Sequence, residues 1–229
     1  HSNLRRQRQM CIRDSIEDSL ISKDADVAVH SLKDMSSKDR DGLEIYAAIA
    51  HPVRNDVLIY RDGVNLSNLE NLHIGTSSLR RKRQCKFFLG NENCSEVRGN
   101  IDTRLGKLHK GDYDAIILAR AGIERLQFNE NYIDLDFLPA IGQGVIAIQC
   151  RSNDEKTKAI LSKIRDERLH QCIEIERYIV RRLNASCSSA LSVEANLSNY
   201  RFNVDLEIYG SEAFISKSSS SEINNQKEA

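Results

Sequence analysis

Residues 114–126 read DAIILARAGIERL, a short apolar run followed directly by a helix-like segment. Three other stretches show the same arrangement: VAVH at 27–30, LHIG at 72–75 and SEVR at 95–98. Short, β-branched apolar runs are typical of buried strands, and a regular alternation of strand and helix favours parallel sheets flanked by helices. The sequence therefore predicts an α/β protein.

The helices that follow these strands have recognisable ends. Ser77 and Ser78 can cap a helix in SSLRRKRQCKFFLG. The segment IDTRLGKLHKG has apolar residues at helical spacing and stops at Gly111. These signals strengthen the strand–helix interpretation.

The hydropathy pattern of the sequence changes after Asp166. Residues 167–183 form one amphipathic pattern and predict a helix. The stretches LSVEANL at 191–197 and YRFNVDLEIYG at 200–210 alternate polar and apolar residues, which predicts an antiparallel hairpin packed on that helix. We expect a separate small α+β unit here.

The two ends of the chain differ from the middle. Residues 1–15 are rich in Arg, lack a periodic apolar face and do not begin with Met, so we expect a foreign leader there. Residues 216–229, SKSSSSEINNQKEA, are polar and rich in Ser, and we expect them to form a frayed tail because they can bury little apolar surface.

Composition excludes several classes of protein. The 229 residues contain 33 Lys and Arg against 33 Asp and Glu, so a generic nucleic-acid coat is disfavoured and any anion site must come from local clustering of charge. Aromatic residues make up 6% and Trp is absent, which also argues against base stacking. We expect no membrane span, since no apolar run approaches ~20 residues. Six scattered Cys predict free thiols in a reducing compartment.

Polar residues gather after each of the four predicted strands. In open α/β sheets, ligands bind at the carboxyl ends of strands, beside helix N-termini. The residues at these ends are His30, Ser31, Lys33 and Asp34; Gly75, Thr76, Ser77, Ser78, Arg80 and Arg81; Arg98, Gly99, Asn100 and Arg104; and Arg120 and Arg125. One guanidinium group can donate two hydrogen bonds to the oxygens of one carboxylate or phosphate. The sequence therefore predicts a ligand that carries several carboxylate or phosphate groups.

Each feature also has an ordinary structural interpretation. The run 80–83 is, on its own, more typical of a solvated helix face, and Lys33 beside Asp34 of a surface ion pair. Cys187, in the loop NASCSSA, would by itself be an ordinary small residue.

Five motifs, in order and spacing, resemble the hydroxymethylbilane synthase family, also called porphobilinogen deaminase: DVAVHSLKDM, IGTSSLRRKRQ, EVRGNIDTRLGKL, DAIILARAGIERL and LPAIGQGVIAIQCR. The resemblance covers about Ile16 to Asp205. It implies two domains like type II periplasmic binding proteins, with parallel-rich sheets, and a small third α+β domain. The implied division is residues 16–50 with 145–166, residues 51–144, and residues 167–229. The glycines in IGQG then indicate a flexible crossover between domains.

The resemblance also implies a chemistry. The family joins four porphobilinogen molecules, with loss of ammonia, on a covalent dipyrromethane primer held by a thioether, which Cys187 matches. Asp34 matches the catalytic carboxylate, whose negative charge stabilises the positive charge of the reacting pyrrole. The same carboxylate donates protons to the pyrrole unit and accepts protons from it. The cofactor-binding residues implied are Cys187, Lys33, Ser78, Arg80, Arg81 and Arg104. The substrate-binding residues implied are Ser31, Thr76, Ser77, Arg98 and Arg125. No metal site is implied.

The sequence departs from the family pattern in places. Ala185 and Ser186 replace the usual glycine pair before Cys187, and the usual proline after it is missing. The family's first strand and last helix have no counterpart, so we expect a fragment truncated at both ends that is inactive and poorly stable alone.

The resemblance implies a cytoplasmic monomer, or a plastid protein if a transit segment was lost, with porphobilinogen and the growing pyrrole chain as partners and with no nucleic-acid or membrane partner. The alternative function is a non-catalytic, periplasmic-type module that binds a small polyanion; it would need the arginines but neither Asp34 nor Cys187.

Overall fold

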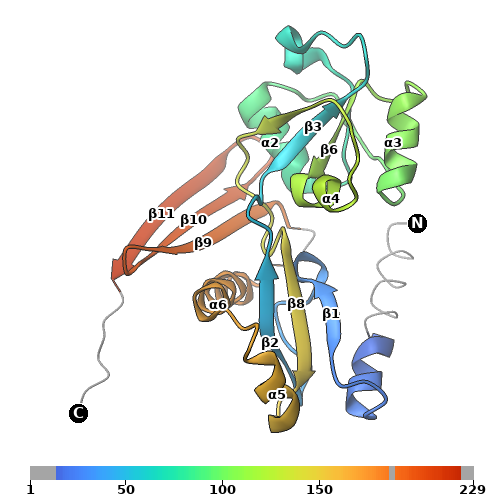
Figure 1. Cartoon of the computed structure of the whole chain (residues 1–229). Coiled ribbons are helices and arrows are strands. Elements are labelled where there is room, and N and C mark those ends of the chain that lie inside the picture. Colours follow the sequence, from blue (N-terminus) through green and yellow to red (C-terminus); the bar gives the residue numbers. More distant parts are fainter. Residues whose placement is uncertain (1–13, 186–188, 223–229) are drawn as a thin grey trace.

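The computed structural model describes residues 14–185 and 189–222, and the strands form three sheets (Figure 1). A helical segment, residues 14–21, precedes the first strand. The strands are β1 (Ala28–Ser31), β2 (Leu43–Ala50), β3 (Asp56–Tyr60), β4 (Ile74–Gly75), β5 (Cys94–Ser95), β6 (Ala115–Ala119), β7 (Tyr132–Leu135), β8 (Val145–Arg151), β9 (Leu191–Ser198), β10 (Arg201–Tyr209) and β11 (Phe214–Glu222). The helices are the 3-10 turns η1 (Leu32–Asp34) and η2 (Leu66–Asn71), and α2 (Leu79–Leu89), α3 (Ile101–His109), α4 (Arg120–Arg125), α5 (Glu155–Leu161) and α6 (Glu167–Arg182).

The first lobe, made of β1, β2, β8, η1, α5 and residues 14–21, is organised around β8. This strand lies between β1 and β2 and is antiparallel to both. Ala147 of β8 packs in a cluster with Ile173 of α6, and Ile148 packs in a second cluster with Leu161 of α5. Both faces of β8 are therefore covered, which explains its nearly continuous apolar sequence.

The second lobe, made of β3–β7 with η2 and α2–α4, has a five-stranded sheet in the order β5-β4-β6-β3-β7. Alternate residues of β6 enter different cores. Ile116 and Leu118 pack with Leu105 of α3, while Ile117 packs with Cys85 of α2. Helices thus cover both faces of the sheet, as the sequence predicted.

The α/β class is as predicted, but the sheets are mixed rather than mainly parallel. Only the pairs β4–β5 and β4–β6 are parallel, whereas β3 is antiparallel to β6 and β7, and the first-lobe sheet is antiparallel throughout. When a helix connects two strands, it carries the chain back to the end of the sheet at which the first strand began, so the two strands are parallel. The chain instead enters β3 through residues 51–55, which come from the first lobe, and β8 through residues 136–144, which come from the second lobe. Both strands therefore run opposite to the strands beside them.

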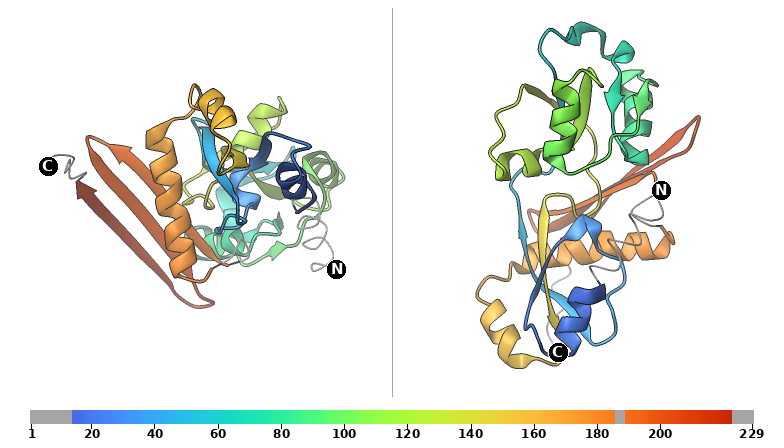
Figure 2. Two further views of the ribbon diagram at one scale, coloured as in Figure 1. Left: turned by 90° about the horizontal axis from the view of Figure 1, so that it is seen from below. Right: turned by 90° about the vertical axis from the view of Figure 1, so that its right-hand side faces the viewer.

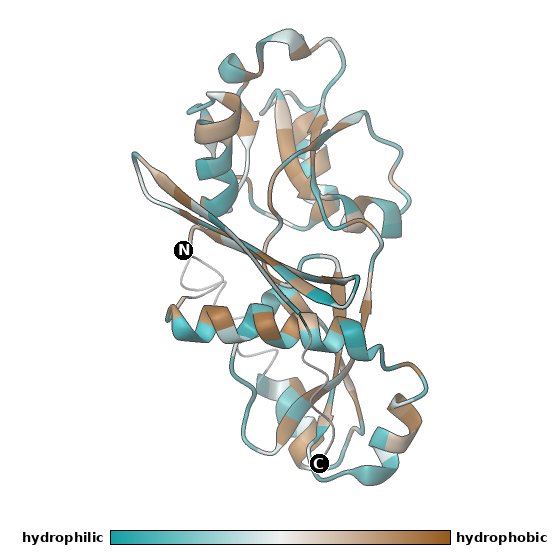
Figure 3. Cartoon of the chain, turned by 90° about the vertical axis from the view of Figure 1, so that its left-hand side faces the viewer, coloured by the Kyte–Doolittle hydropathy of each residue, from teal (hydrophilic) through white to brown (hydrophobic). Residues whose placement is uncertain are grey.

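The third unit consists of α6 and an antiparallel sheet in the order β9-β10-β11, which lies along the helix in Figure 2. The two-sided hydropathy of α6 is visible in Figure 3, and its buried side includes Ile173 and Val180. The expectation that the tail from residue 216 is frayed was wrong as far as residue 222. Those residues pair with β10 through backbone hydrogen bonds, which need no apolar side chains, and they stay exposed. Residues 223–229 lie outside the described part of the chain.

The two segments that link the lobes run side by side. The N–H of His51 donates to the carbonyl of Gly144 at 2.8 Å. Gly142 and Gly144 have φ of 64° and 75°, a left-handed conformation that glycine adopts without strain. The IGQG stretch is therefore a crossover between lobes, as the sequence predicted, and its flexibility stays a prediction.

Candidate functional site

The first part of the candidate site is the 3-10 turn η1, directly after β1. Leu32 is buried in the first-lobe core and anchors the turn, while Lys33 and Asp34 are exposed. Within residues 14–185 and 189–222, the Asp34 carboxylate has no hydrogen-bond or ion-pair partner, and it forms no ion pair with Lys33. The surface ion-pair interpretation of these two residues is therefore wrong. Ser31 precedes the turn, and its side chain does not cap it.

The second part is the N-terminus of α2, which follows β4. Thr76 is buried, and its hydroxyl accepts a hydrogen bond from the N–H of Ser78. Ser77 donates its hydroxyl to the carbonyl of Val97, which ties this turn to the segment after β5. Ser78 is the N-cap predicted from the sequence, and its side chain accepts from the N–H of Arg81 at 3.4 Å. The three hydroxyls hold the helix entrance in place.

Arg80 and Arg81 share one buried carboxylate, that of Asp56. Arg80 Nη2 lies 2.7 Å from one Asp56 oxygen, and Arg81 Nη2 lies 2.7 Å from the other. The two arginine side chains are buried, so the solvated-face interpretation is wrong for them. Burial alone would raise the pKa of Asp56, but the two guanidinium groups outweigh it and hold that pKa well below its usual range.

Buried amides support this ion-pair cluster. Gln84 accepts from Arg80 Nη1 at 2.6 Å and donates to the carbonyl of Leu138. Gln143, in the crossover between the lobes, donates to Asp56 at 2.8 Å. The arginines are thus fixed in position by residues from α2 and from the crossover.

Sequence reasoning missed Asp56, Gln84 and Gln143. Asp56 opens the apolar run DVLIY, and a carboxylate at the start of a buried strand was the one available signal. Its role depends on partners that lie 24 and 25 residues further along the chain.

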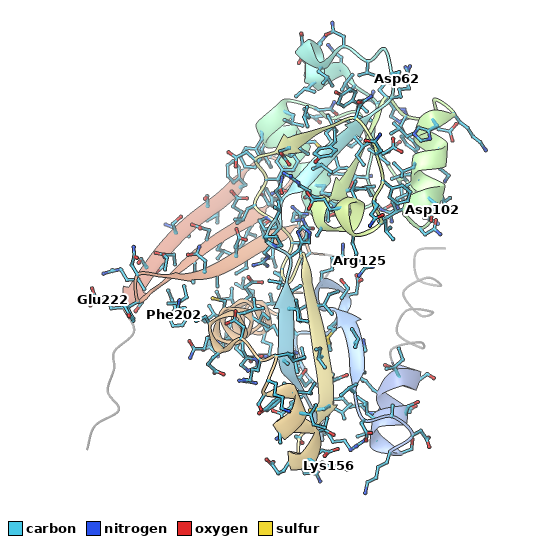
Figure 4. The ribbon with its side chains drawn as sticks, viewed as in Figure 1. Asp62, Asp102, Arg125, Lys156, Phe202 and Glu222 are labelled. Atoms are coloured by element: carbon cyan, nitrogen blue, oxygen red, sulfur yellow. The ribbon has the colours of Figure 1, made fainter. Side chains whose placement is uncertain are left out.

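The remaining predicted arginines differ in their surroundings. Arg104 Nε donates to the carbonyl of Gly99 at 3.0 Å and is half-buried. Arg98 is exposed and pairs with Glu96 at 2.7 Å. Arg125, at the end of α4, is exposed on the side of the second lobe that faces the first (Figure 4). Arg120, the other arginine after β6, pairs with Glu124 and Asp134 instead.

Electrostatic contacts show that the two lobes contribute to one cluster. The Lys33 side chain reaches solvent, yet the surrounding protein removes water from its ammonium and lowers its pKa, and Arg81 lowers the pKa further. Asp34 and Asp56 act in the opposite direction, and Arg104 adds a smaller lowering. Lys33 of the first lobe therefore lies within electrostatic range of the second-lobe arginines.

Two observations indicate that this cluster suits an anionic ligand. Lys33, Arg80 and Arg81 supply three cations against the two carboxylates of Asp34 and Asp56, and Arg104 lies within electrostatic range of Lys33. Among the described residues, the buried Nε of Arg80 has no hydrogen-bond partner, and such an unpaired donor is costly unless an acceptor is supplied. An anion with several carboxylate groups would balance the charge.

A hollow of about 820 Å³ lies away from the cationic cluster. Its lining includes Arg54 and Phe88 but also the carboxylates of Glu194, Asp205 and Glu207, and none of the predicted site residues. Its acidic lining would repel a polycarboxylate, so the cationic cluster remains the better candidate. Cys187 lies outside the described residues, in the connection between α6 and β9.

Comparisons with known proteins agree with the motifs. Residues 7–159 match the sequence model of a family described as "Porphobilinogen deaminase, dipyromethane cofactor binding domain". A porphobilinogen deaminase of Brevibacillus brevis is 41% identical over 187 residues, which is 80% of this chain and 60% of that protein. One of Staphylococcus aureus is 40% identical over 192 residues, 81% of this chain and 62% of that protein. The chain thus spans about 60% of the length of these relatives.

Solved structures give weaker likenesses. The L-cystine solute receptor of Neisseria gonorrhoeae, in its unliganded open conformation, has a TM-score of 0.41 at 15% identity, with 76% of this chain and 74% of that chain covered. A score this low does not bear on the ligand of this chain. In the part of the chain that the structure describes, no helix is both long and apolar enough to cross a membrane.

Proposed function

This chain belongs to the porphobilinogen deaminase family, and we propose that its protein is a transferase that joins four porphobilinogen units, with loss of ammonia, into hydroxymethylbilane. The observation that carries the proposal is the cationic cluster at the lobe boundary, where Lys33 of η1 lies within electrostatic range of Arg81 of α2. Each pyrrole unit bears an acetate and a propionate, so a growing chain is a polycarboxylate. Its charge is complementary to the cluster.

The residues present fit a dipyrromethane cofactor. Its carboxylates would be held by Lys33, Ser78, Arg80, Arg81 and Arg104, and the unpaired Nε of Arg80 offers a donor for one carboxylate oxygen. Attachment would be a thioether to Cys187. When bound, dipyrromethane supplies the primer on which the pyrrole chain grows.

Asp34 is proposed as the catalytic residue. Its carboxylate has no described partner, so it is available to a ligand, and η1 places it beside Lys33, which lies within electrostatic range of the second-lobe cations. Loss of ammonia from the substrate leaves a positive charge that a fixed carboxylate stabilises. The same carboxylate can deliver and accept protons in that step.

The predicted substrate contacts divide into two kinds. Arg98 and Arg125 are exposed, and they can reach carboxylates of incoming or extended pyrrole units. Thr76 and Ser77 are engaged with the chain itself, so their proposed contribution is the position of the α2 entrance as well as hydrogen bonds to substrate. Ser31 adds a hydroxyl at the end of β1.

The family resemblance also implies a domain division, a cellular compartment and an oligomeric state, and we include these in the proposal. Residues 16–50 with 145–166, residues 51–144 and residues 167–229 form three domains, and the protein acts as a cytoplasmic monomer without nucleic-acid or membrane partners. Each sheet of the structure falls within one of these divisions, which supports it.

Mass spectrometry tests the proposal on the full-length protein that contains this chain, purified from cells that make porphobilinogen. Trypsin cleaves after Arg182 and Arg201, so peptide 183–201 should carry the mass of dipyrromethane. The variant Cys187→Ser should lack the adduct, and Cys150→Ser should retain it. Asp34→Asn should keep the adduct but release ammonia from porphobilinogen at least a hundredfold more slowly, the scale expected for loss of one preorganised charge.

The outcomes separate the proposal from its alternative. Protein that binds porphobilinogen without an adduct and without release of ammonia would be a binding module. Unmodified Cys187 in protein that does release ammonia would contradict the cofactor attachment.

A further inference from the structure

Two arginines of α6 hold the stretch of chain that directly follows η1. Arg177 is buried, and its two Nη atoms donate to the two carboxylate oxygens of Asp39 at 3.0 and 2.8 Å. Arg177 Nη2 also donates to the backbone carbonyl of Ser36 at 3.1 Å. About one turn further along α6, Arg181 Nη1 donates to the carbonyl of Ser37 at 2.8 Å. Three residues after the turn are therefore bound to one helix.

Apolar packing anchors η1 itself to the same helix. Leu32 is buried in the cluster that contains Ile173 of α6, and Met35 packs against that cluster. The N–H of Met35 donates to the carbonyl of Leu32 at 3.0 Å, which closes the turn. Lys33 and Asp34 lie between these two anchored residues. The position of the Asp34 carboxylate therefore depends on how firmly the chain on either side of it is held.

The contact between Arg177 and Asp39 fixes a direction as well as a distance. A guanidinium that donates to both oxygens of one carboxylate is restricted to the common plane of the two groups. The side chain of Arg177 is 3% exposed and that of Asp39 is 28% exposed, so water competes little for the arginine. Glu174 also accepts from Arg177 Nη1, at 3.2 Å. Arg177 therefore keeps one counter-charge when Asp39 is replaced.

We propose that Arg177 is a positioning residue for Asp34: through Asp39 and the Ser36 carbonyl, it holds the chain after η1 and so fixes the Asp34 carboxylate at the lobe boundary. The inference rests on the proposed catalytic role of Asp34. Stabilisation of a developing charge depends on a carboxylate that is already in place, so a loosened turn should slow the reaction. Substrate binding should change little, because Asp56 and not Arg177 holds Arg80.

Hydrogen exchange tests the anchoring without reference to activity. In the full-length protein that contains this chain, Asp39→Asn should accelerate exchange at the amide of Met35 at least tenfold and leave the amides of β6 at the parent rates. The control Asp26→Asn also removes a carboxylate from a mostly buried arginine of the first lobe, Arg151, and should not accelerate exchange at Met35. Unchanged exchange at Met35 in Asp39→Asn would overturn the proposal.

The rate of ammonia release from porphobilinogen measures the consequence for Asp34. Asp39→Asn should lower kcat at least tenfold, change KM less than twofold and keep the full amount of dipyrromethane adduct. A loss of stability alone would lower the amount of adduct and the amount of active protein together. Faster exchange at Met35 with kcat within twofold of the parent value would also overturn the positioning role.

A double variant shows whether the two side chains act through one contact. Arg177→Lys keeps the charge but cannot donate to both carboxylate oxygens in the same geometry, so it should also lower kcat. Arg177→Lys with Asp39→Asn should then be no slower than the slower single variant. Losses that multiply would show two separate effects and would contradict the proposal. If the parent protein releases no ammonia, the proposed function fails, whereas the exchange measurement still decides whether Arg177 anchors the turn.

Discussion

At the level of single residues, Asp56 has the most demanding position in the site, because one fully buried carboxylate holds both Arg80 and Arg81. Replacement of Asp56 by Asn keeps the size of the side chain but leaves two buried guanidinium groups without a counter-charge. We expect the free energy of unfolding to fall by about 3–5 kcal/mol, as when one partner of a buried ion pair is removed. Urea unfolding measures this change, and the exposed Asp136→Asn is the matched control.

The same carboxylate predicts a dependence on pH. The pKa of Asp56 is lower in the folded state than in the unfolded chain, so its contribution to stability is complete above the unfolded pKa of about 4 and is lost as pH falls below it. Asp56→Asn should therefore lose less stability than the parent protein between pH 5 and about 2. Parallel acid unfolding curves for the two proteins would contradict the assignment of this ion pair.

Residue identities at the site could be predicted only where the chain carries a local signal. Lys33 and Asp34 follow a strand within one motif, and Ser78 is a cap that sequence patterns reveal. The burial of Arg80 and Arg81 could not be predicted, because the same basic run on an exposed helix is more common. It depends on Asp56, and no local pattern links that residue to them.

At the level of elements, the entrance of α3 imposes the sharpest local constraint. Gly99 has a φ of 121°, and a Cβ there would lie 2.5 Å from the side chain of Thr103. Gly99→Ala should therefore destabilise the protein by about 1–3 kcal/mol and displace Arg104, whose Nε donates to the Gly99 carbonyl.

The matched control lies in the same helix. Gly106 is interior to α3, and a Cβ there would meet no atom within 4 Å. Gly106→Ala should raise the free energy of unfolding by about 0.5–1 kcal/mol, because Ala loses less conformational entropy than Gly in a helix. Thermal unfolding of both variants checks the pair, and equal shifts of the same sign would contradict the geometry.

Elements with their own start and stop signals were predictable, and strand direction was not. The capped helices α2 and α3 begin and end close to the positions that the sequence indicates, and α6 follows its amphipathic pattern. The sequence gives no local sign that β3 and β8 run antiparallel to their neighbours, because direction depends on how the chain crosses between lobes. β11 was missed because its partner supplies backbone hydrogen bonds, and its Ser-rich sequence has no apolar pattern.

At the level of the whole molecule, one carboxylate joins all three parts. Glu176 of α6 is buried and accepts from both Nη atoms of Arg54, in the first crossover, at 3.0 and 3.2 Å. It also accepts from the N–H of Gly142, in the second crossover, at 2.9 Å, and from the N–H of Ala195 in β9. The third unit is therefore hydrogen-bonded to both segments that link the lobes, which lie between them in Figure 1. A change in the angle between the lobes would strain these bonds.

The consequence can be measured with Glu176→Ala. Removal of the carboxylate leaves the half-buried Arg54 guanidinium with only the Gln143 carbonyl and the more distant Glu194 carboxylate, and takes the acceptor from two backbone N–H groups. The free energy of unfolding should therefore fall by about 3–5 kcal/mol. Hydrogen exchange should accelerate at the amides of Gly142 and Ala195, while the amides of Ile116 and Ile117, within the second-lobe core, should retain their protection until global unfolding. The control Glu174→Ala, on the same helix but with a more exposed side chain, should cost no more than about 1 kcal/mol. If both variants accelerate exchange equally at every amide, Glu176 would be one structural ion-pair partner among many, and the coupling of the crossovers to the third unit would have to reside in other contacts.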